Sequence, residues 1–86
     1  MRVYYSDNFL KYARKLDDKQ QVELSRLVVL LKENPFHSKL HVKSLSGDFS
    51  GLYSFRVRRD WRALFKILSA DEIILVEVGH RKDIYR

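Results

Sequence analysis

Three runs of strand-forming residues occupy the last third of this 86-residue chain, at positions 52–58, 61–67 and 73–78. Side chains along a strand alternate between its two faces, and the first two runs alternate apolar and polar residues in this way. The breaks at 59–60 and 69–71 are short enough to be hairpin turns. The pattern therefore predicts an antiparallel three-strand meander with one apolar face.

The opposite face of the predicted meander is cationic. From the first two runs it carries Ser54, Arg56, Arg58, Arg62 and Lys66. For any single arginine, ordinary solvation of an exposed sheet face is the simpler interpretation. From position 56 onward, however, the cations outnumber the acidic residues eight to five, so salt bridges cannot pair them all. These cations are Arg56, Arg58, Arg59, Arg62, Lys66, Arg81, Lys82 and Arg86. Because arginine suits phosphate oxygens, this face is a candidate phosphate-binding surface.

The N-terminal half predicts one strand and two helices. Residues 2–5 are β-branched and aromatic, which favours a strand. A first helix is predicted over 7–16; a second begins at the cap Asp17 or Asp18 and ends at Asn34-Pro35. The apolar stripe of the second helix comprises Leu24, Leu27, Val28 and Leu31, widened by Val22, Val29 and Leu30.

The order of these elements predicts the fold class. Only a couple of residues separate the two helices, so they are expected to form an antiparallel hairpin. Residues 36–50 have the composition of a loop. The order β-α-α-β-β-β predicts an α+β fold, in which a small antiparallel-dominated sheet carries the N-terminal helical hairpin on one face. At this length we expect a single domain over residues 1–86. The sequence does not identify which strand of the sheet pairs with the N-terminal strand.

The charge balance narrows the class of partner. The chain has 17 Lys and Arg against 11 Asp and Glu, a formal net charge of +6. Such a charge suits a polyanion such as nucleic acid, although many small proteins are simply basic. The absence of cysteine excludes a disulfide framework. No secretory signal and no apolar run long enough to span a membrane is visible, so a cytoplasmic protein without membrane contact is expected.

The residues after the third run bring acid–base and stacking groups toward one end of the sheet. RNA cleavage through the ribose 2′-hydroxyl needs a base for its proton, cations for the phosphorane charge and an acid for the leaving oxygen. His80, Arg81 and Tyr85 together offer such a set, with Lys82 as a further cation, and tyrosine also stacks on unpaired bases. Taken singly, His80 is more simply a packing residue and Tyr85 an anchor.

The predicted loop also carries cationic and imidazole groups. We expect Lys39, His41 and Lys43 to flank a nucleic-acid groove. His37 and His41 are four positions apart, a spacing that binds metal on a helix. Because they lie in a predicted loop without a nearby carboxylate, no metal site is expected.

Several of these segments resemble a known family. They read LSG…SGLYSFRV from position 45, DWRALF from position 60 and VEVGHRKDIYR from position 76. In these segments, and in length, element order and charge, the chain resembles the RelE/ParE superfamily of toxins from type II toxin–antitoxin modules, and within it the RelE-like branch. The resemblance implies an endoribonuclease without metal or cofactor that cleaves mRNA in the ribosomal A site. It also implies a cognate antitoxin as partner.

The resemblance further implies roles for individual residues. Arg62 is expected to contact the scissile phosphate, and Arg81 to stabilise charge or assist the leaving group. Tyr85 is expected to stack on or orient the substrate base. The basic contacts of the first meander strand match Arg56, together with Ser54 and Arg58.

The general base departs from the family's pattern. Some RelE-like toxins carry lysines on the first meander strand, where this chain has Ser54 and Arg56, and arginine is a poor base. His80, His41 and Lys43 stay open as candidates. Some relatives carry a glutamate in the preceding loop, which this chain lacks. Two alternatives also stay open: a ParE-like toxin that inhibits gyrase without cutting RNA, and a non-catalytic RNA-binding relative.

Overall fold

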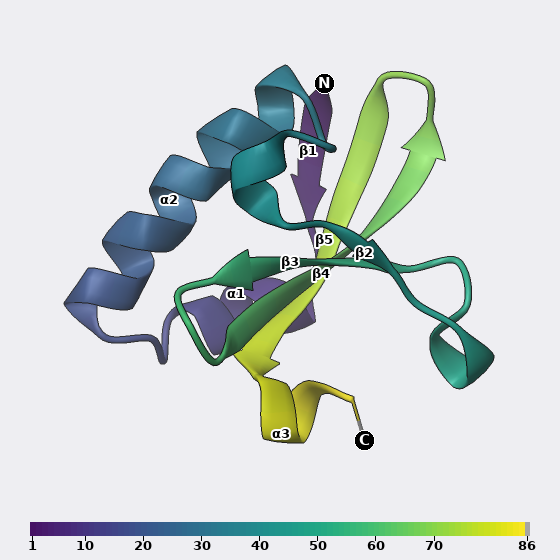
Figure 1. The fold of residues 1–86 in the computed structure, drawn as a ribbon. Helices are drawn as coiled ribbons and strands as arrows, with labels where there is room; N and C mark the ends of the chain where they lie inside the picture. The colour runs from purple at the N-terminus through teal and green to yellow at the C-terminus, as the bar shows by residue number, and fades with distance from the viewer. Residues whose placement is uncertain (86) are drawn as a thin grey trace.

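A five-stranded sheet forms the centre of the computed structural model, which describes residues 1–85 (Figure 1). Its strands are β1 (Arg2–Tyr5), β2 (Lys43–Ser44), β3 (Tyr53–Val57), β4 (Trp61–Ser69) and β5 (Glu72–His80), in the order β1-β5-β4-β3-β2. Neighbouring strands are antiparallel except β1, which runs parallel to β5. The predicted meander is therefore confirmed as β3, β4 and β5, and the N-terminal strand lies beside β5.

Two helices, α1 (Asp7–Ala13) and α2 (Asp18–Glu33), pack on one face of this sheet. Ser6 caps α1: its hydroxyl accepts a hydrogen bond from the Phe9 amide at 3.0 Å and donates one to the Val76 carbonyl at 2.7 Å. The cap therefore also ties the start of α1 to β5. Asp17 caps α2 through reciprocal hydrogen bonds with Gln20.

The core lies between these helices and the sheet, and Figure 1 shows α2 lying along one side of the strands. Its buried members are Phe9, Leu16, Leu24, Leu27, Val28, Leu31, Leu40, Phe55, Val57, Ala63, Phe65, Ile73, Leu75 and Val78. The predicted widening of the α2 stripe is wrong for Val22 and Val29, which are 70% and 56% exposed. The helical turn places both on the side opposite the stripe. The first helix ends at Ala13, short of the predicted Leu16, yet Leu16 still enters the core.

The second face of the sheet is partly covered as well. Ser54 and Leu64 have the strand parity opposite to the core residues, yet both are buried. A short helix, α3 (Arg81–Ile84), follows β5 and buries Ile84 against Gly79, where an added Cβ would lie 3.9 Å from the Ile84 Cβ. The residues after β5 are therefore a helix folded back on the end of the sheet, where the sequence predicts only a tail.

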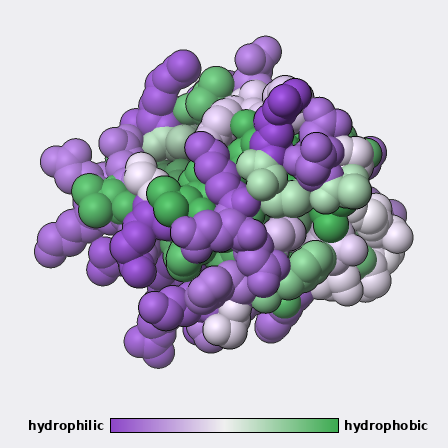
Figure 2. Space-filling model, turned by 90° about the horizontal axis from the view of Figure 1, so that it is seen from above, coloured by the Kyte–Doolittle hydropathy of each residue, from purple (hydrophilic) through white to green (hydrophobic). Residues whose placement is uncertain are grey.

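The segment predicted as a loop contains three short elements. These are the 3₁₀ turns η1 (Ser38–Leu40) and η2 (Gly47–Phe49) and the edge strand β2 between them. Elements of two or three residues carry too little periodicity to be predicted. The face shown in Figure 2 mixes projecting hydrophilic side chains with small apolar patches. Within residues 1–85, no helix is long and apolar enough to cross a membrane.

Leu31 and Val29 offer a matched test of the α2 packing. Leu31 is fully buried and Val29 is 56% exposed on the same helix. We expect Leu31→Ala to lower the free energy of unfolding by about 3 kcal/mol, because it leaves a cavity in the core. Val29→Ala is expected to change it by less than about 0.5 kcal/mol. Urea denaturation followed by circular dichroism measures both, and equal losses would contradict this packing.

Candidate active site

A shallow depression of about 760 Å³ lies where β4, the loop around η2 and α3 meet. It is lined by Lys43, Leu45, Ser46, Phe49, Arg62, Arg81, Lys82 and Tyr85. Four of these residues are cations and none is acidic. We call it the cationic depression. The structure thus brings together Arg62, Arg81, Lys82, Tyr85 and Lys43 from the predicted site.

The strand register places Arg62 in this depression. Arg62 lies opposite Arg56 on β3 and opposite Gly79 on β5. Its side chain therefore lies on the sheet face that α1 and α2 leave uncovered. The Arg62 Nη1 group donates hydrogen bonds to the carbonyls of Arg59 and Trp61, both at 3.0 Å. The β3–β4 turn thus fixes the guanidinium through backbone oxygens.

Arg81 reaches the depression from the first position of α3. Its amide donates to the Asp60 carbonyl at 2.8 Å, and its Nε lies 3.5 Å from the Asp60 carboxylate. That ion pair is longer than a strong charge-assisted hydrogen bond, and both side chains are substantially exposed. Exposed pairs of this kind contribute about 0–1 kcal/mol. A bound phosphate can therefore compete for the Arg81 guanidinium.

Two aromatic rings form another wall of the depression. Phe49 and Tyr85 meet edge to face, with ring centroids 6.1 Å apart and planes at 83°. Tyr85 is 39% exposed, so part of this residue is accessible to a ligand. Phe49, Leu45 and Ser46 are site residues that the sequence does not predict. The available signal was the presence of Leu45 and Phe49 beside the glycines at positions 47 and 51, and it is a weak one because the predicted loop also holds Phe36, Leu40 and Val42.

Four predicted site residues lie outside the cationic depression. Arg56 is exposed on β3, across from Arg62. Arg58 adopts a left-handed backbone (φ 61°) in the turn and lies beside the start of α2, away from the arginine face predicted for it. His41 is exposed at the end of η1. His80, the fourth, lies on the other face of the sheet. Arg86 lies outside the described residues.

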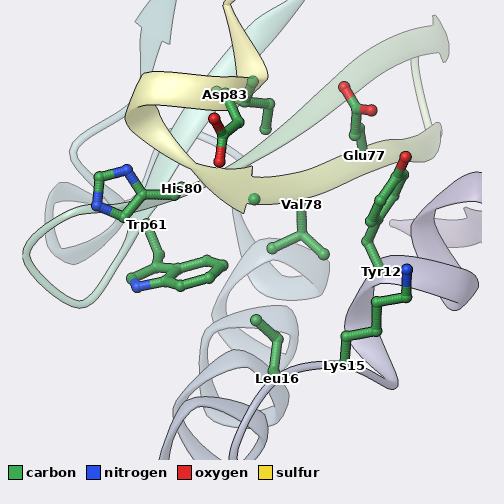
Figure 3. Close-up of a pocket in the computed structure, with 10 residues that line it drawn as sticks. Tyr12, Lys15, Leu16, Trp61, Glu77, Val78, His80 and Asp83 are labelled. Carbon is green, nitrogen blue, oxygen red and sulfur yellow. The ribbon is translucent and has the colours of Figure 1, made fainter.

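His80 lines a separate, more enclosed cavity of about 260 Å³ between α1 and the end of β5 (Figure 3). The register pairs His80 with Trp61, and strand alternation therefore puts His80 on the opposite face from Arg62. The two rings meet edge to face, with centroids 5.5 Å apart. The predicted grouping of His80 with Arg62, Arg81 and Tyr85 is not found. Within residues 1–85, no three His, Cys, Asp or Glu side chains group as a metal site.

Comparisons with known proteins agree on the fold. Over residues 3–85 the chain matches the model of a family described as "ParE toxin of type II toxin-antitoxin system, parDE". Among curated proteins, no sequence match is found. A structure of YafQ from E. coli is similar over 100% of both chains, with a TM-score of 0.80 and 22% identity.

Two further solved structures share this fold. A YoeB/ParE toxin from Agrobacterium tumefaciens has a TM-score of 0.80 and 15% identity, over 93% of this chain and 98% of that one. A RelB-RelE antitoxin-toxin complex from Methanococcus jannaschii has a TM-score of 0.78 and 22% identity, over 95% of this chain and 94% of that one. The predicted α+β, RelE-like fold is confirmed. Because the family match spans nearly the whole chain, the chain belongs to the ParE toxin family, within the RelE/ParE superfamily of type II toxin–antitoxin toxins.

Proposed function

We propose that this toxin is a metal-independent endoribonuclease that cleaves mRNA in the ribosomal A site and that a cognate antitoxin holds it inactive. The observation that carries the proposal is the composition of the cationic depression, in which Arg62, Arg81 and Tyr85 lie with Lys43 and Lys82. No carboxylate lines this depression. Asp60 pairs with Arg81 at 3.5 Å, and because that pair is exposed to solvent, an external anion can compete with it.

The reaction supported by such a site is transfer at phosphorus. The ribose 2′-oxygen attacks the adjacent phosphorus, a P–O2′ bond forms and the P–O5′ bond breaks. The 2′-hydroxyl gives its proton to a base, and the 5′-oxygen takes up a proton as it leaves. Because negative charge grows on the phosphoryl oxygens, donors already in place lower the barrier. Arg62, fixed through Nη1 by two backbone carbonyls, is suited to that role, with Arg81 beside it.

Geometry favours Lys43 as the base among the three candidates. A general base has to come within hydrogen-bond reach of the proton that it takes. Lys43 lines the cationic depression, whereas His41 and His80 do not. Lys43 is positioned by β2, where it lies opposite Ser54 of β3. We assign proton transfer to Lys43 on this ground.

Tyr85 and Phe49 are suited to hold an unpaired base. Single-stranded RNA is commonly bound by stacking of its bases on aromatic side chains. Edge-to-face packing on Phe49 restrains the Tyr85 ring before RNA binds. The substrate class is therefore RNA with at least one base free to stack.

The partner is proposed on charge and on fold likeness. The RelE-like structure from M. jannaschii is a complex with an antitoxin, RelB. A net charge of +6 favours an acidic partner for this chain. We therefore assign to its antitoxin an amphipathic, acidic segment that covers the cationic depression.

A second candidate function is inhibition of DNA gyrase without RNA cleavage. The family match to ParE toxins favours it, and the cationic depression contains no histidine and no carboxylate. Gyrase supercoiling and mRNA cleavage on translating ribosomes, measured with the same purified protein, separate the two functions. We expect cleaved mRNA and unimpaired supercoiling; intact mRNA with inhibited supercoiling would establish the second function instead.

The two arginines of the depression provide the most direct mutational test. We expect Arg62→Ala and Arg81→Ala each to lower the rate of mRNA cleavage about 10²–10³-fold, because each removes a donor to the developing phosphorane charge. Cleavage is measured by primer extension on translating ribosomes, with growth arrest in cells as a second readout. Arg26→Ala is the matched control, since Arg26 pairs with Glu23 on α2. If Arg62→Ala and Arg81→Ala were both as toxic as the unaltered chain, the nuclease proposal would be wrong.

Lys43→Arg tests the assignment of the base. Arginine places a cation at the same position but stays protonated near neutral pH, so it cannot offer the unprotonated nitrogen that a general base needs. We expect Lys43→Arg to bind RNA as the unaltered chain does and to lose about 10²-fold or more in single-turnover cleavage. Lys39→Arg, in the neighbouring turn η1, is expected to cleave normally. Full cleavage by Lys43→Arg would show that Lys43 contributes charge alone.

A further inference from the structure

α3 carries three of the residues that line the cationic depression: Arg81, Lys82 and Tyr85, the last at its end. A four-residue helix has almost no stability of its own. The placement of these residues therefore depends on whatever fastens α3 to the sheet.

Two contacts fasten α3 to the end of the sheet. The Arg81 amide donates to the Asp60 carbonyl at 2.8 Å, which ties the start of α3 to the β3–β4 turn. Ile84 is buried with its Cβ 3.9 Å from the position of a Cβ on Gly79. Gly79 lies opposite Arg62, so this contact is on the Arg62 face of the sheet.

The third fastening comes from the other face and is made by His80. His80 is the N-cap of α3, with an extended backbone (φ −69°, ψ 142°), and its Nδ1 accepts a hydrogen bond from the Lys82 amide at 3.1 Å. Edge-to-face packing on Trp61 holds the ring in this position. Figure 3 shows the imidazole beside α3 and next to the Trp61 indole. Through this cap, α3 is held from both faces of the sheet.

We propose that His80 is a positioning residue, which acts through the Lys82 amide to hold α3 and so places Arg81, Lys82 and Tyr85 in the cationic depression. A ring nitrogen that accepts a hydrogen bond carries no proton, so the cap requires Nδ1 to be unprotonated. The same bond occupies the nitrogen that faces α3. His80 thus contributes to the site without touching substrate. This role of His80 rests on the proposed nuclease function wherever mRNA cleavage is the quantity measured.

Two substitutions separate positioning from acid–base chemistry. Asparagine is a good N-cap, because its side-chain oxygen accepts from the same backbone amide, and it exchanges no proton near neutral pH. His80→Asn therefore keeps the cap and removes the imidazole, whereas His80→Ala removes both. We expect His80→Asn to cleave mRNA within about threefold of the unaltered chain and His80→Ala to lose about tenfold or more, since small misplacements of reacting groups are costly.

A second readout works without nuclease activity. Amide hydrogen exchange at Lys82, measured by NMR, reports directly on the cap. We expect exchange at this amide to be about fivefold faster in His80→Ala, the scale of a lost cap, and unchanged in His80→Asn. The β4 amides serve as the internal reference for global folding.

The outcomes are distinct. Cleavage lost equally in both variants, with the Lys82 amide still protected in His80→Asn, would overturn the inference and make His80 a chemical participant. An unprotected Lys82 amide in the unaltered chain, or full cleavage and protection in His80→Ala, would overturn it as well. If the unaltered chain cleaves no RNA, the proposed function fails, while the amide exchange still decides the role of His80.

Discussion

The pairing of β4 with β5 fixes where Arg62 lies and where α3 begins. Its register sets Arg62 against Gly79 and Trp61 against His80. A slip of one residue would exchange the two faces and turn Arg62 toward the helices. The apolar residues of the same strands, Ala63, Phe65 and Val78, are completely or almost completely buried under α1 and α2, so the core prevents such a slip. Core packing and the position of Arg62 thus depend on the same alignment.

The sequence predicts the parts of the structure that have a period or a local signal. Strand alternation predicts the meander, and the Asp17 and Asn34-Pro35 signals predict both ends of α2. Local patterns do not predict β2, η2 or α3, because these elements are too short to show a period and depend on contacts with the rest of the fold. The burial of Ser54 and Leu64 is not predicted either, because strand alternation places both on the face expected to be exposed.

The site shows the same division between local pattern and register. The sequence predicts the cationic face because Arg62 alternates with Trp61 and Ala63. The sequence does not predict on which face His80 lies, because that depends on which β4 residue pairs with it. Once Trp61 is known to be that residue, the separation of His80 from Arg62 follows from strand geometry. Arg58 leaves the predicted face because the chain turns there with a positive φ.

Four cations and no carboxylate line the depression, and the Arg81–Asp60 pair is long and exposed, so we expect an anion to bind there. Chemical-shift mapping with a short single-stranded RNA, 2′-O-methylated to prevent cleavage, tests directly whether this depression is where RNA binds. The account predicts that the largest shifts occur at Phe49, Arg62, Arg81 and Tyr85 and weaken as salt is added. Shifts concentrated around Trp61 and His80, or at Arg58 and the start of α2, would contradict it.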